Sequence, residues 1–346
     1  MHGFPSGGLA GFDECGWRRS FPPVHHMFNL GEFAMKKSLI ALAVLAASGA
    51  AMAQSSVTLY GVVDLGIGKL GKGKVAMQGG QIVNNGVSRI GFRGVEDLGG
   101  GLKVGFNYEQ GINAENGAAA GYERQANVWV DGGFGQFKMG RALTPSYNGM
   151  EVWELLGAPN YSVVGNTYGY VGKASARNSS QFSYKTPVFS GFSGEIGFVT
   201  KGDFGNDKSK VDANISYVNG PLGVAFSYSK VTKAKANYAL GGKYNFGTFE
   251  LAASYNDARD YDVNPNVGRR SGFTIGGLVK FENMSLALDV ARDTKHQAVN
   301  PAVKYKKYTN AVVEAKYALS KRTFFYADYL RLDSTNNYGI GLRHNF

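Results

Sequence analysis

Residues 102–110 read LKVGFNYEQ, and this stretch alternates large apolar side chains with small or polar ones. One face carries Leu102, Val104, Phe106 and Tyr108. The other face carries Lys103, Gly105, Asn107 and Glu109. A period of two residues is typical of a β-strand. The charged side chains of the second face do not fit a dry protein core, because burying an unpaired charge is costly.

The same alternation recurs along the chain. Approximate predicted strands are 57–69, 87–96, 101–112, 121–132, 135–141, 176–186, 192–201, 209–219, 222–231, 236–246, 248–258, 270–281, 284–294, 304–317, 322–332 and 336–346. These are sixteen strands, and an even number suits a closed antiparallel barrel in which both chain termini lie on the same side. Short connections such as DLGG and GGFG alternate with longer, more polar ones, and the longest spans 142–175. Tight turns on one side and larger loops on the other are typical of transmembrane barrels.

The distribution of apolar and polar faces predicts which face meets lipid. A soluble barrel would hide its apolar face, but here the opposite face is too polar to be a core. We therefore expect an all-β fold: a 16-stranded antiparallel transmembrane β-barrel with lipid outside and a water-filled lumen. After residue 54 the chain contains no run of 18 apolar residues, so the sequence predicts no membrane-spanning helix there.

The N-terminal part predicts export. Residues 35–53, MKKSLIALAVLAASGAAMA, combine a basic head, a short apolar run and an A-x-A site, which is the pattern of a secretory signal peptide. We expect cleavage after Ala53. Residues 1–34 show no strand or helix periodicity and are interpreted as a gene-start artefact, with translation beginning at Met35. The expected mature chain is a barrel over residues 54–346.

The composition leaves little material for catalysis. Cys15, the single cysteine of the chain, lies before the predicted cleavage site, and only His296 and His344 remain after it. No G-x-S-x-G motif occurs. The sequence therefore predicts neither an enzyme nor a cofactor or metal site.

Two features superficially match nucleotide binding and nucleic-acid binding, but the rest of the sequence argues against both functions. GIGKLG at 66–71 matches a dinucleotide-binding pattern, yet that pattern requires a following helix, and residues 72–86 are expected to form a flexible loop. Removal of residues 1–53 lowers the net charge only from +11 to +10. Export and the interspersed acidic residues argue against nucleic acid as the partner of this basic chain.

Several motifs resemble a known family. They are SSVTLYGVVD (55–64), SRIGFRGVEDLGGGLKVGFNYE (88–109), GGFGQFKMGR (132–141), ARNSSQFSYKTPVFSGF (176–192), YALSKRTFFYADY (317–329) and GLRHNF (341–346). In this order they resemble the general porins of Gram-negative outer membranes, most closely the beta-proteobacterial and neisserial type. The resemblance implies a homotrimer in the outer membrane, passive diffusion of ions and small hydrophilic solutes, and a third loop that folds inward. It also implies that Phe346 is the signal read by the outer-membrane assembly machinery.

The resemblance also implies the residues of a pore eyelet. Its basic ladder matches Arg89, Arg141 and Arg177. Alternation supports an inward direction for Arg89 together with Arg93, and for Arg177. Alternation groups Arg141 with the lipid-facing side chains, where an arginine at mid-depth costs roughly 2–4 kcal/mol, so a bulge or twist would have to turn it inward.

The long connection 142–175 supplies the expected acidic side, Glu151 and Glu154. These predicted charges point to a mildly anion-selective channel. Inward-pointing lysines support this preference: Lys103, Lys243, Lys280, Lys304 and Lys306. Loop lysines could instead bind lipopolysaccharide. The alternative is a substrate-specific or cation-preferring channel whose loops have an adhesive role.

Overall fold

The computed structural model describes residues 56–171, 176–205, 207–259 and 266–346. The predicted extension 1–34 and signal peptide 35–53 lie outside these described residues. Among the described helices, none is long and apolar enough to cross a membrane.

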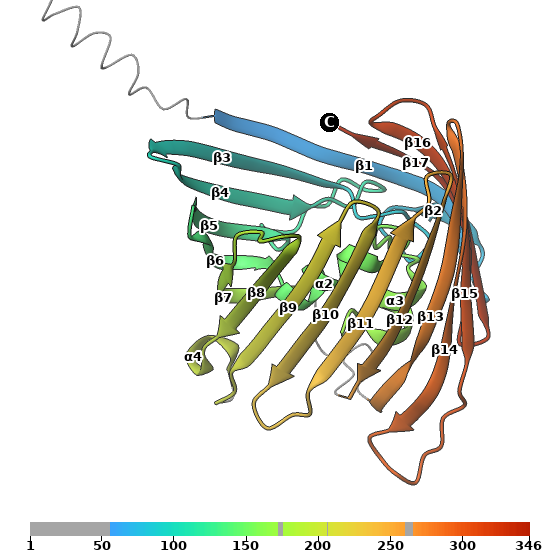
Figure 1. Ribbon diagram of the computed structural model, residues 1–346. Coiled ribbons are helices and arrows are strands. Elements are labelled where there is room, and N and C mark those ends of the chain that lie inside the picture. Colours follow the sequence, from blue (N-terminus) through green and yellow to red (C-terminus); the bar gives the residue numbers. More distant parts are fainter. Residues whose placement is uncertain (1–55, 172–175, 206, 260–265) are drawn as a thin grey trace, which may run out of the picture. The chain divides into compact units, whose positions relative to one another are not determined.

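The strands form one antiparallel sheet that closes on itself (Figure 1). In the described residues its long strands are β1 (Ser56–Leu70), β3 (Arg89–Gly99), β4 (Leu102–Gly111), β5 (Gln125–Gly132), β6 (Gly135–Leu143), β7 (Arg177–Lys185), β8 (Phe192–Val199), β9 (Lys210–Asn219), β10 (Leu222–Val231), β11 (Asn237–Asn245), β12 (Phe249–Ala258), β13 (Val267–Phe281), β14 (Met284–Ala298), β15 (Thr309–Ala318), β16 (Thr323–Leu332) and β17 (Thr335–Asn345). The barrel closes where β1 pairs with β17, as in Leu65 opposite Leu342. On its other side β1 pairs with β3, as in Val62 opposite Arg89. The predicted sixteen-stranded barrel is confirmed.

One short strand was not predicted. Strand β2 (Val75–Gln78) lies within the segment 72–86, which the sequence analysis interprets as a flexible loop, and it pairs with the far half of β1. Four residues of alternation are too few to separate a strand from a loop. The interpretation of 72–86 as loop throughout is therefore wrong at this point.

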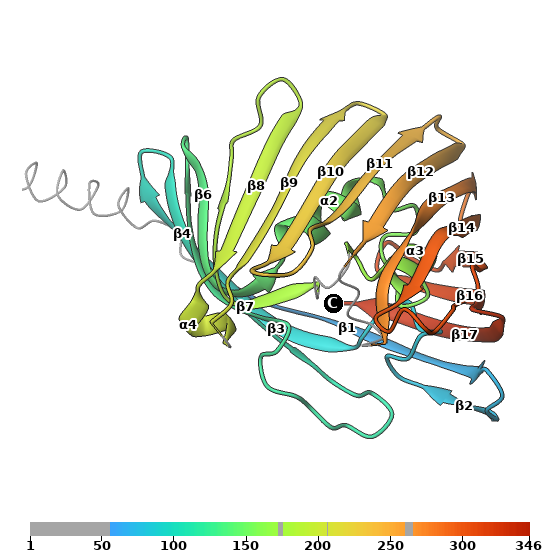
Figure 2. The same ribbon diagram turned by 90° about the horizontal axis from the view of Figure 1, so that it is seen from below.

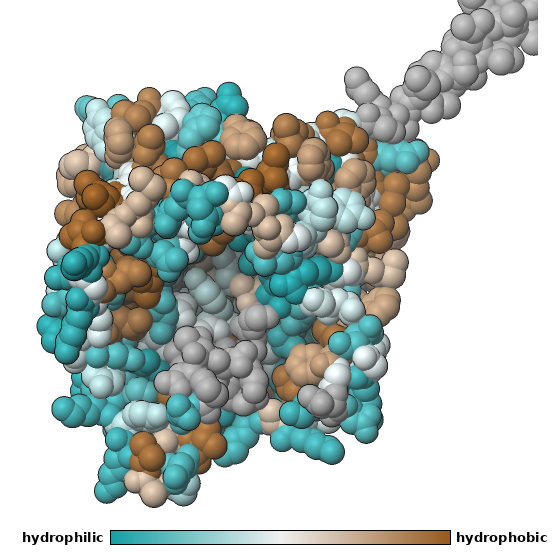
Figure 3. Space-filling view, turned by 180° about the vertical axis from the view of Figure 1, so that it is seen from behind, coloured by the Kyte–Doolittle hydropathy of each residue, from teal (hydrophilic) through white to brown (hydrophobic). Residues whose placement is uncertain are grey.

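Alternate residues of the strands face opposite environments. In β1, Leu59 and Ile67 are about half exposed, whereas Asp64 is completely buried. Exposed apolar and buried charged side chains are the inverse of a soluble protein. The space-filling view shows hydrophobic side chains over much of the upper part of one face, and hydrophilic ones around a hollow and over the lower part (Figure 3).

Within the described part of the chain, three helices interrupt the strand pattern: α2 (Pro145–Trp153), α3 (Val163–Tyr168) and α4 (Lys201–Phe204). Helix α2 begins after Thr144, whose Oγ1 accepts the Tyr147 N–H at 3.2 Å, with Pro145 in its first turn. Both devices favour a helix start, because they satisfy or remove free N–H groups. Helices α2 and α3 lie within the ring of strands in the view from below (Figure 2).

The buried apolar residues lie between these helices and the polar face of the wall. One cluster combines Met150, Trp153 and Val164 with Ala225 and Ala239 of β10 and β11. A Cβ added to Gly241 would lie 2.2 Å from the ring of Trp153, so only glycine lets the indole approach the wall so closely.

Polar contacts also bind the segment to the wall. The fully buried carboxylate of Asp212 on β9 accepts the backbone N–H of Ser146 at 2.5 Å. Asn310 of β15 donates through Nδ2 to Thr167 Oγ1 at 2.9 Å. The loop is therefore attached to the wall at both of its helices.

Candidate functional site

Four arginines line one polar cavity at the inner wall. They come from different strands: Arg89 from β3, Arg124 just before β5, Arg177 from the start of β7 and Arg343 from β17. The cavity has a volume of about 340 Å³. The register places Arg89 opposite Val62 and Arg343 opposite Asp64, so that both lie beside the middle of β1.

Glu109 of β4 joins two of these arginines. Its carboxylate is 5% exposed and lies 2.7 Å from Arg124 Nε and 3.7 Å from Arg89 Nε. The Tyr60 hydroxyl donates to its second oxygen at 3.1 Å. A carboxylate shared by two guanidinium groups fixes both side chains and offsets half of their charge.

The loop between β6 and β7 forms the opposite side of the cavity. Tyr147, Glu151, Asn160 and Tyr170 line it. The side chain of Glu151 is exposed to the cavity, which itself lies inside the barrel. The surrounding protein displaces part of the water around the carboxyl group and so raises its pKa. A hydrogen bond from Tyr147 and the charge of Arg177 oppose that rise. The cavity therefore has a basic wall and a loop that carries one carboxylate.

The family of the chain follows from its sequence. The sequence profile described as Gram-negative porin matches residues 39–337. This chain belongs to the Gram-negative porin family. The resemblance seen in the motifs is thereby confirmed, and the protein is a porin of the outer membrane.

Individual relatives agree with this assignment. Outer membrane porin protein 32 of Delftia acidovorans is 37% identical over 242 residues, which cover 63% of this chain and 68% of that protein. The solved anion-selective porin from Comamonas acidovorans has a TM-score of 0.69 at 24% identity, covering 85% of this chain and 100% of that one. The trimer form of OmpT from Vibrio cholerae has a TM-score of 0.64 at 17% identity, covering 84% and 99%. The first two of these relatives are porins by name, and porins are channels rather than enzymes.

Two of the predicted basic residues of this porin lie outside the cavity lining. The guanidinium of Arg93 lies over the ring of Tyr60, 5.3 Å from its centroid. Arg141 lies at a register shift between Gly140 and Ala142, where strand β6 departs from simple alternation. Its Nη1 donates to Ser179 Oγ at 2.7 Å, and its Nε donates to the carbonyl of Glu123. The bulge that Arg141 would need is thus present, but its side chain is held beside the cavity.

Glu154 has a different place from Glu151. Its side chain is 1% exposed and accepts hydrogen bonds from the N–H groups of Leu156 and Ala158, at 2.9 and 2.6 Å, and from the Ser162 hydroxyl at 2.7 Å. Burial raises the pKa of this carboxyl group. Glu154 therefore holds the turn after α2, and it does not line the cavity.

Phe346 lies at the closure of the barrel. Its backbone N–H and C=O pair with Gly61 at 3.1 and 3.0 Å. A Cβ added to Gly61 would lie 2.3 Å from the aromatic ring, so the terminal ring covers a position without a side chain on the outer face.

The sequence analysis did not select Arg124, Arg343 or Glu109. Alternation did place Glu109 and Arg343 on the inward face of their strands, and this was the available signal. Arg124 lies within the predicted strand 121–132 but just before the observed β5, which begins at Gln125. Arg343 donates through Nη1 to Asn85 at 2.8 Å across 258 positions of the chain, a contact that no local pattern reveals.

Proposed function

We propose that this porin is a passive, mildly anion-selective channel whose eyelet is the arginine-lined cavity, narrowed by an inward-folded third loop. The observation that carries the proposal is the charge of the cavity lining. Four arginines and two glutamates, Glu109 and Glu151, line it, which leaves a formal charge of +2 when all are ionised. Basic groups at a constriction favour anions.

The loop that would narrow the channel is residues 142–171. Its helices pack against the polar face of β9–β16 through the contacts of Asp212, Gly241 and Asn310. In addition, Lys243 Nζ donates to the carbonyl of Glu154 at 3.1 Å. A segment held at several points can keep a fixed pore diameter, which passive sieving of small hydrophilic solutes requires.

The test is the zero-current potential of the purified protein in a planar bilayer under a KCl gradient. We expect the sign of chloride preference, and we expect Arg89→Ala with Arg177→Ala to abolish it. Lys321→Ala with Arg322→Ala removes an equal charge from an exposed turn outside the cavity and should leave the potential unchanged. Cation preference of the unaltered protein would favour the alternative channel and would reject the arginine eyelet.

The remaining assignments belong to the same proposal. A homotrimer is supported by the solved trimer form of a structural relative. Export by residues 35–53, recognition of Phe346 by the assembly machinery, and contact with lipopolysaccharide fit an outer-membrane porin. N-terminal sequencing of the purified protein should begin at Gln54, and a start within residues 1–34 would contradict these domain boundaries.

A further inference from the structure

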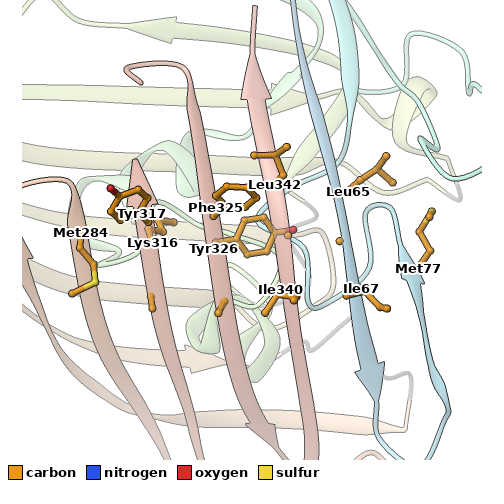
Figure 4. Close-up of a pocket in the computed structure, with 14 residues that line it drawn as sticks. Leu65, Ile67, Met77, Met284, Lys316, Tyr317, Phe325, Tyr326, Ile340 and Leu342 are labelled. Atoms are coloured by element: carbon orange, nitrogen blue, oxygen red, sulfur yellow. The ribbon is translucent and has the colours of Figure 1, made fainter. Parts of the chain in front are cut away.

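The connection between β2 and β3 lies inside the barrel. We name residues 79–88 the inward segment; they include Val83 and Asn84, which are 2% and 0% exposed. Strands β1, β16 and β17 lie side by side at this part of the wall, and Ile67 and Ile340 mark its lipid face (Figure 4). The inward segment packs against the opposite face of the same strands. It therefore occupies part of the lumen.

Glycines of the wall make room for the inward segment. Gly68 on β1 and Gly339 on β17 lie opposite each other in the register. A Cβ added to Gly68 would lie 2.9 Å from Val83 Cγ2, and one added to Gly339 would lie 3.0 Å from Val83 Cβ. Because side chains alternate along a strand, both glycines belong to the inward face. The side chain of Val83 thus rests where the wall itself has no side chains.

Asn84 fixes the shape of the inward segment. Its Oδ1 accepts the N–H groups of Gly80 and Gln81 at 2.9 and 2.8 Å. Its Nδ2 donates to the Tyr326 hydroxyl at 3.1 Å and to Asp64 Oδ1 at 3.3 Å. A buried amide whose donors and acceptor are bonded favours a single conformation. The segment is therefore held against the wall in one shape.

The inward segment is also joined to the loop 142–171. Asn160 of that loop donates through Nδ2 to the carbonyl groups of Gly80 and Gln81, at 2.9 and 3.0 Å. Asn85 donates through Nδ2 to the Tyr161 hydroxyl at 2.7 Å. The segment and the loop therefore form one connected structure inside the barrel.

The end of the inward segment reaches the arginine-lined cavity, where Asn85, Gly86 and Val87 belong to the lining. Asn85 Oδ1 accepts a hydrogen bond from Arg343 Nη1 at 2.8 Å, and the Gly86 N–H donates to Asp64 Oδ2 at 2.8 Å. The side chain of Val87 is apolar and partly exposed. A neutral side chain at this place limits the width of the cavity without adding charge to it.

We propose that the inward segment is a second constriction element of the channel, and that Val87 sets the size of the solutes that pass. The segment narrows the opening from the side of β1 and β17, opposite to the effect of the loop on its own side of the cavity. The proposal rests on the proposed function in one respect, namely that this cavity is the constriction of the channel. It does not depend on anion preference.

The test varies only the side-chain volume at position 87 of the purified porin. Val87→Ala, Val87→Leu and Val87→Trp form a series of increasing volume without a change of charge. Single-channel conductance, and the swelling of porin-containing liposomes in sugars of increasing size, measure the width of the opening. We expect Val87→Trp to lower the conductance about twofold or more, because an indole occupies part of the opening, and to exclude sugars that the unaltered porin admits. Val87→Ala should raise both the conductance and the size limit.

A matched control is Val188→Trp. Val188 is 70% exposed on the turn between β7 and β8, outside the cavity lining, so this change should alter neither quantity. Equal conductance and an equal size limit across the Val87 series would overturn the proposal. If Arg89→Ala with Arg177→Ala still changes the zero-current potential in that case, the eyelet stands and the inward segment alone is excluded. If neither set of variants has an effect, the cavity is not the constriction and both proposals fail.

Discussion

Among single residues, Glu109 is the carboxylate that joins two arginines of the proposed eyelet. It contacts both Arg89 and Arg124 and is itself held by Tyr60. Its carboxylate is nearly inaccessible at 5% exposure, yet its field acts on the adjacent cavity. In the proposed eyelet, selectivity would therefore depend on a residue that permeating ions barely touch.

Replacing Glu109 by Gln should strengthen anion preference. The change removes one negative charge while the amide preserves the shape of the side chain. A unit charge about 7 Å from an ion in water contributes about 0.6 kcal/mol, with opposite sign for chloride and potassium. The two effects add to about 1.2 kcal/mol in the chloride-to-potassium permeability ratio, which should therefore rise about sevenfold. Zero-current potentials measure this ratio. Glu109→Asp keeps the charge and should stay near the unaltered protein, and an unchanged ratio in Glu109→Gln would contradict the role given to this carboxylate.

Glu151 predicts a pH dependence of selectivity. Because burial raises the pKa of its carboxyl group, Glu151 gains a proton at a higher pH than an ordinary glutamate does. Protonation removes a negative charge from the lining of the cavity. Anion preference should therefore increase as the pH falls from neutral toward the ordinary pKa of a glutamate. Glu151→Gln should show the stronger preference already at neutral pH and a flatter pH profile. A fall of anion preference on acidification would contradict this sign.

At the scale of elements, the loop 142–171 is fitted to the wall by small residues. Gly241 on β11 admits the ring of Trp153, which is 1% exposed. Glu154 then fixes the turn after α2 through three hydrogen bonds. The position of the loop therefore depends on shape at the wall and on satisfied polar groups in the turn.

A methyl group at this contact should displace the loop. In Gly241→Ala the new Cβ meets the indole of Trp153 at 2.2 Å, and overpacking of this kind costs typically 1–3 kcal/mol. We expect a lower thermal unfolding temperature and an altered single-channel conductance. At the neighbouring Gly242 the nearest atom lies 3.5 Å from an added Cβ, so Gly242→Ala should change neither quantity. Equal behaviour of the two variants would exclude close packing as the determinant.

At the scale of the whole molecule, closure of the barrel joins β1, the first described strand, to β17, the last. Gly61 and Phe346 exchange backbone hydrogen bonds, and the sheet has no free edge for a further strand. In the proposed homotrimer, subunits would then associate through the outer faces of their barrels. Broad apolar contact of this kind is typical of obligate oligomers.

We predict that the purified protein is a trimer. Mild detergent should preserve the oligomer, because its contacts are apolar and lie within the membrane. Size-exclusion chromatography with light scattering measures the protein mass independently of detergent. A monomeric mass in several mild detergents, with conductance intact, would contradict the homotrimer and leave the channel assignment standing.

The amino-acid sequence by itself determined the strands and their faces. Alternation with a period of two is local, so the residues from Leu102 to Gln110 show their two faces without any neighbour. For the same reason Arg89 and Glu109 could be placed on the inward face. The outer-membrane character also follows from local features, namely the porin motifs, and the pattern of 35–53 predicts export.

Tertiary structure alone decided which inward residues meet. The approach of Arg343 to Asn85 and the binding of Arg89 and Arg124 by Glu109 depend on strand register and on the curvature of the closed wall. Likewise, Glu151 and Glu154 are three residues apart, yet one faces the cavity and the other is buried in the loop turn. A short-range pattern cannot distinguish them, because the difference arises from how the whole loop packs against distant strands.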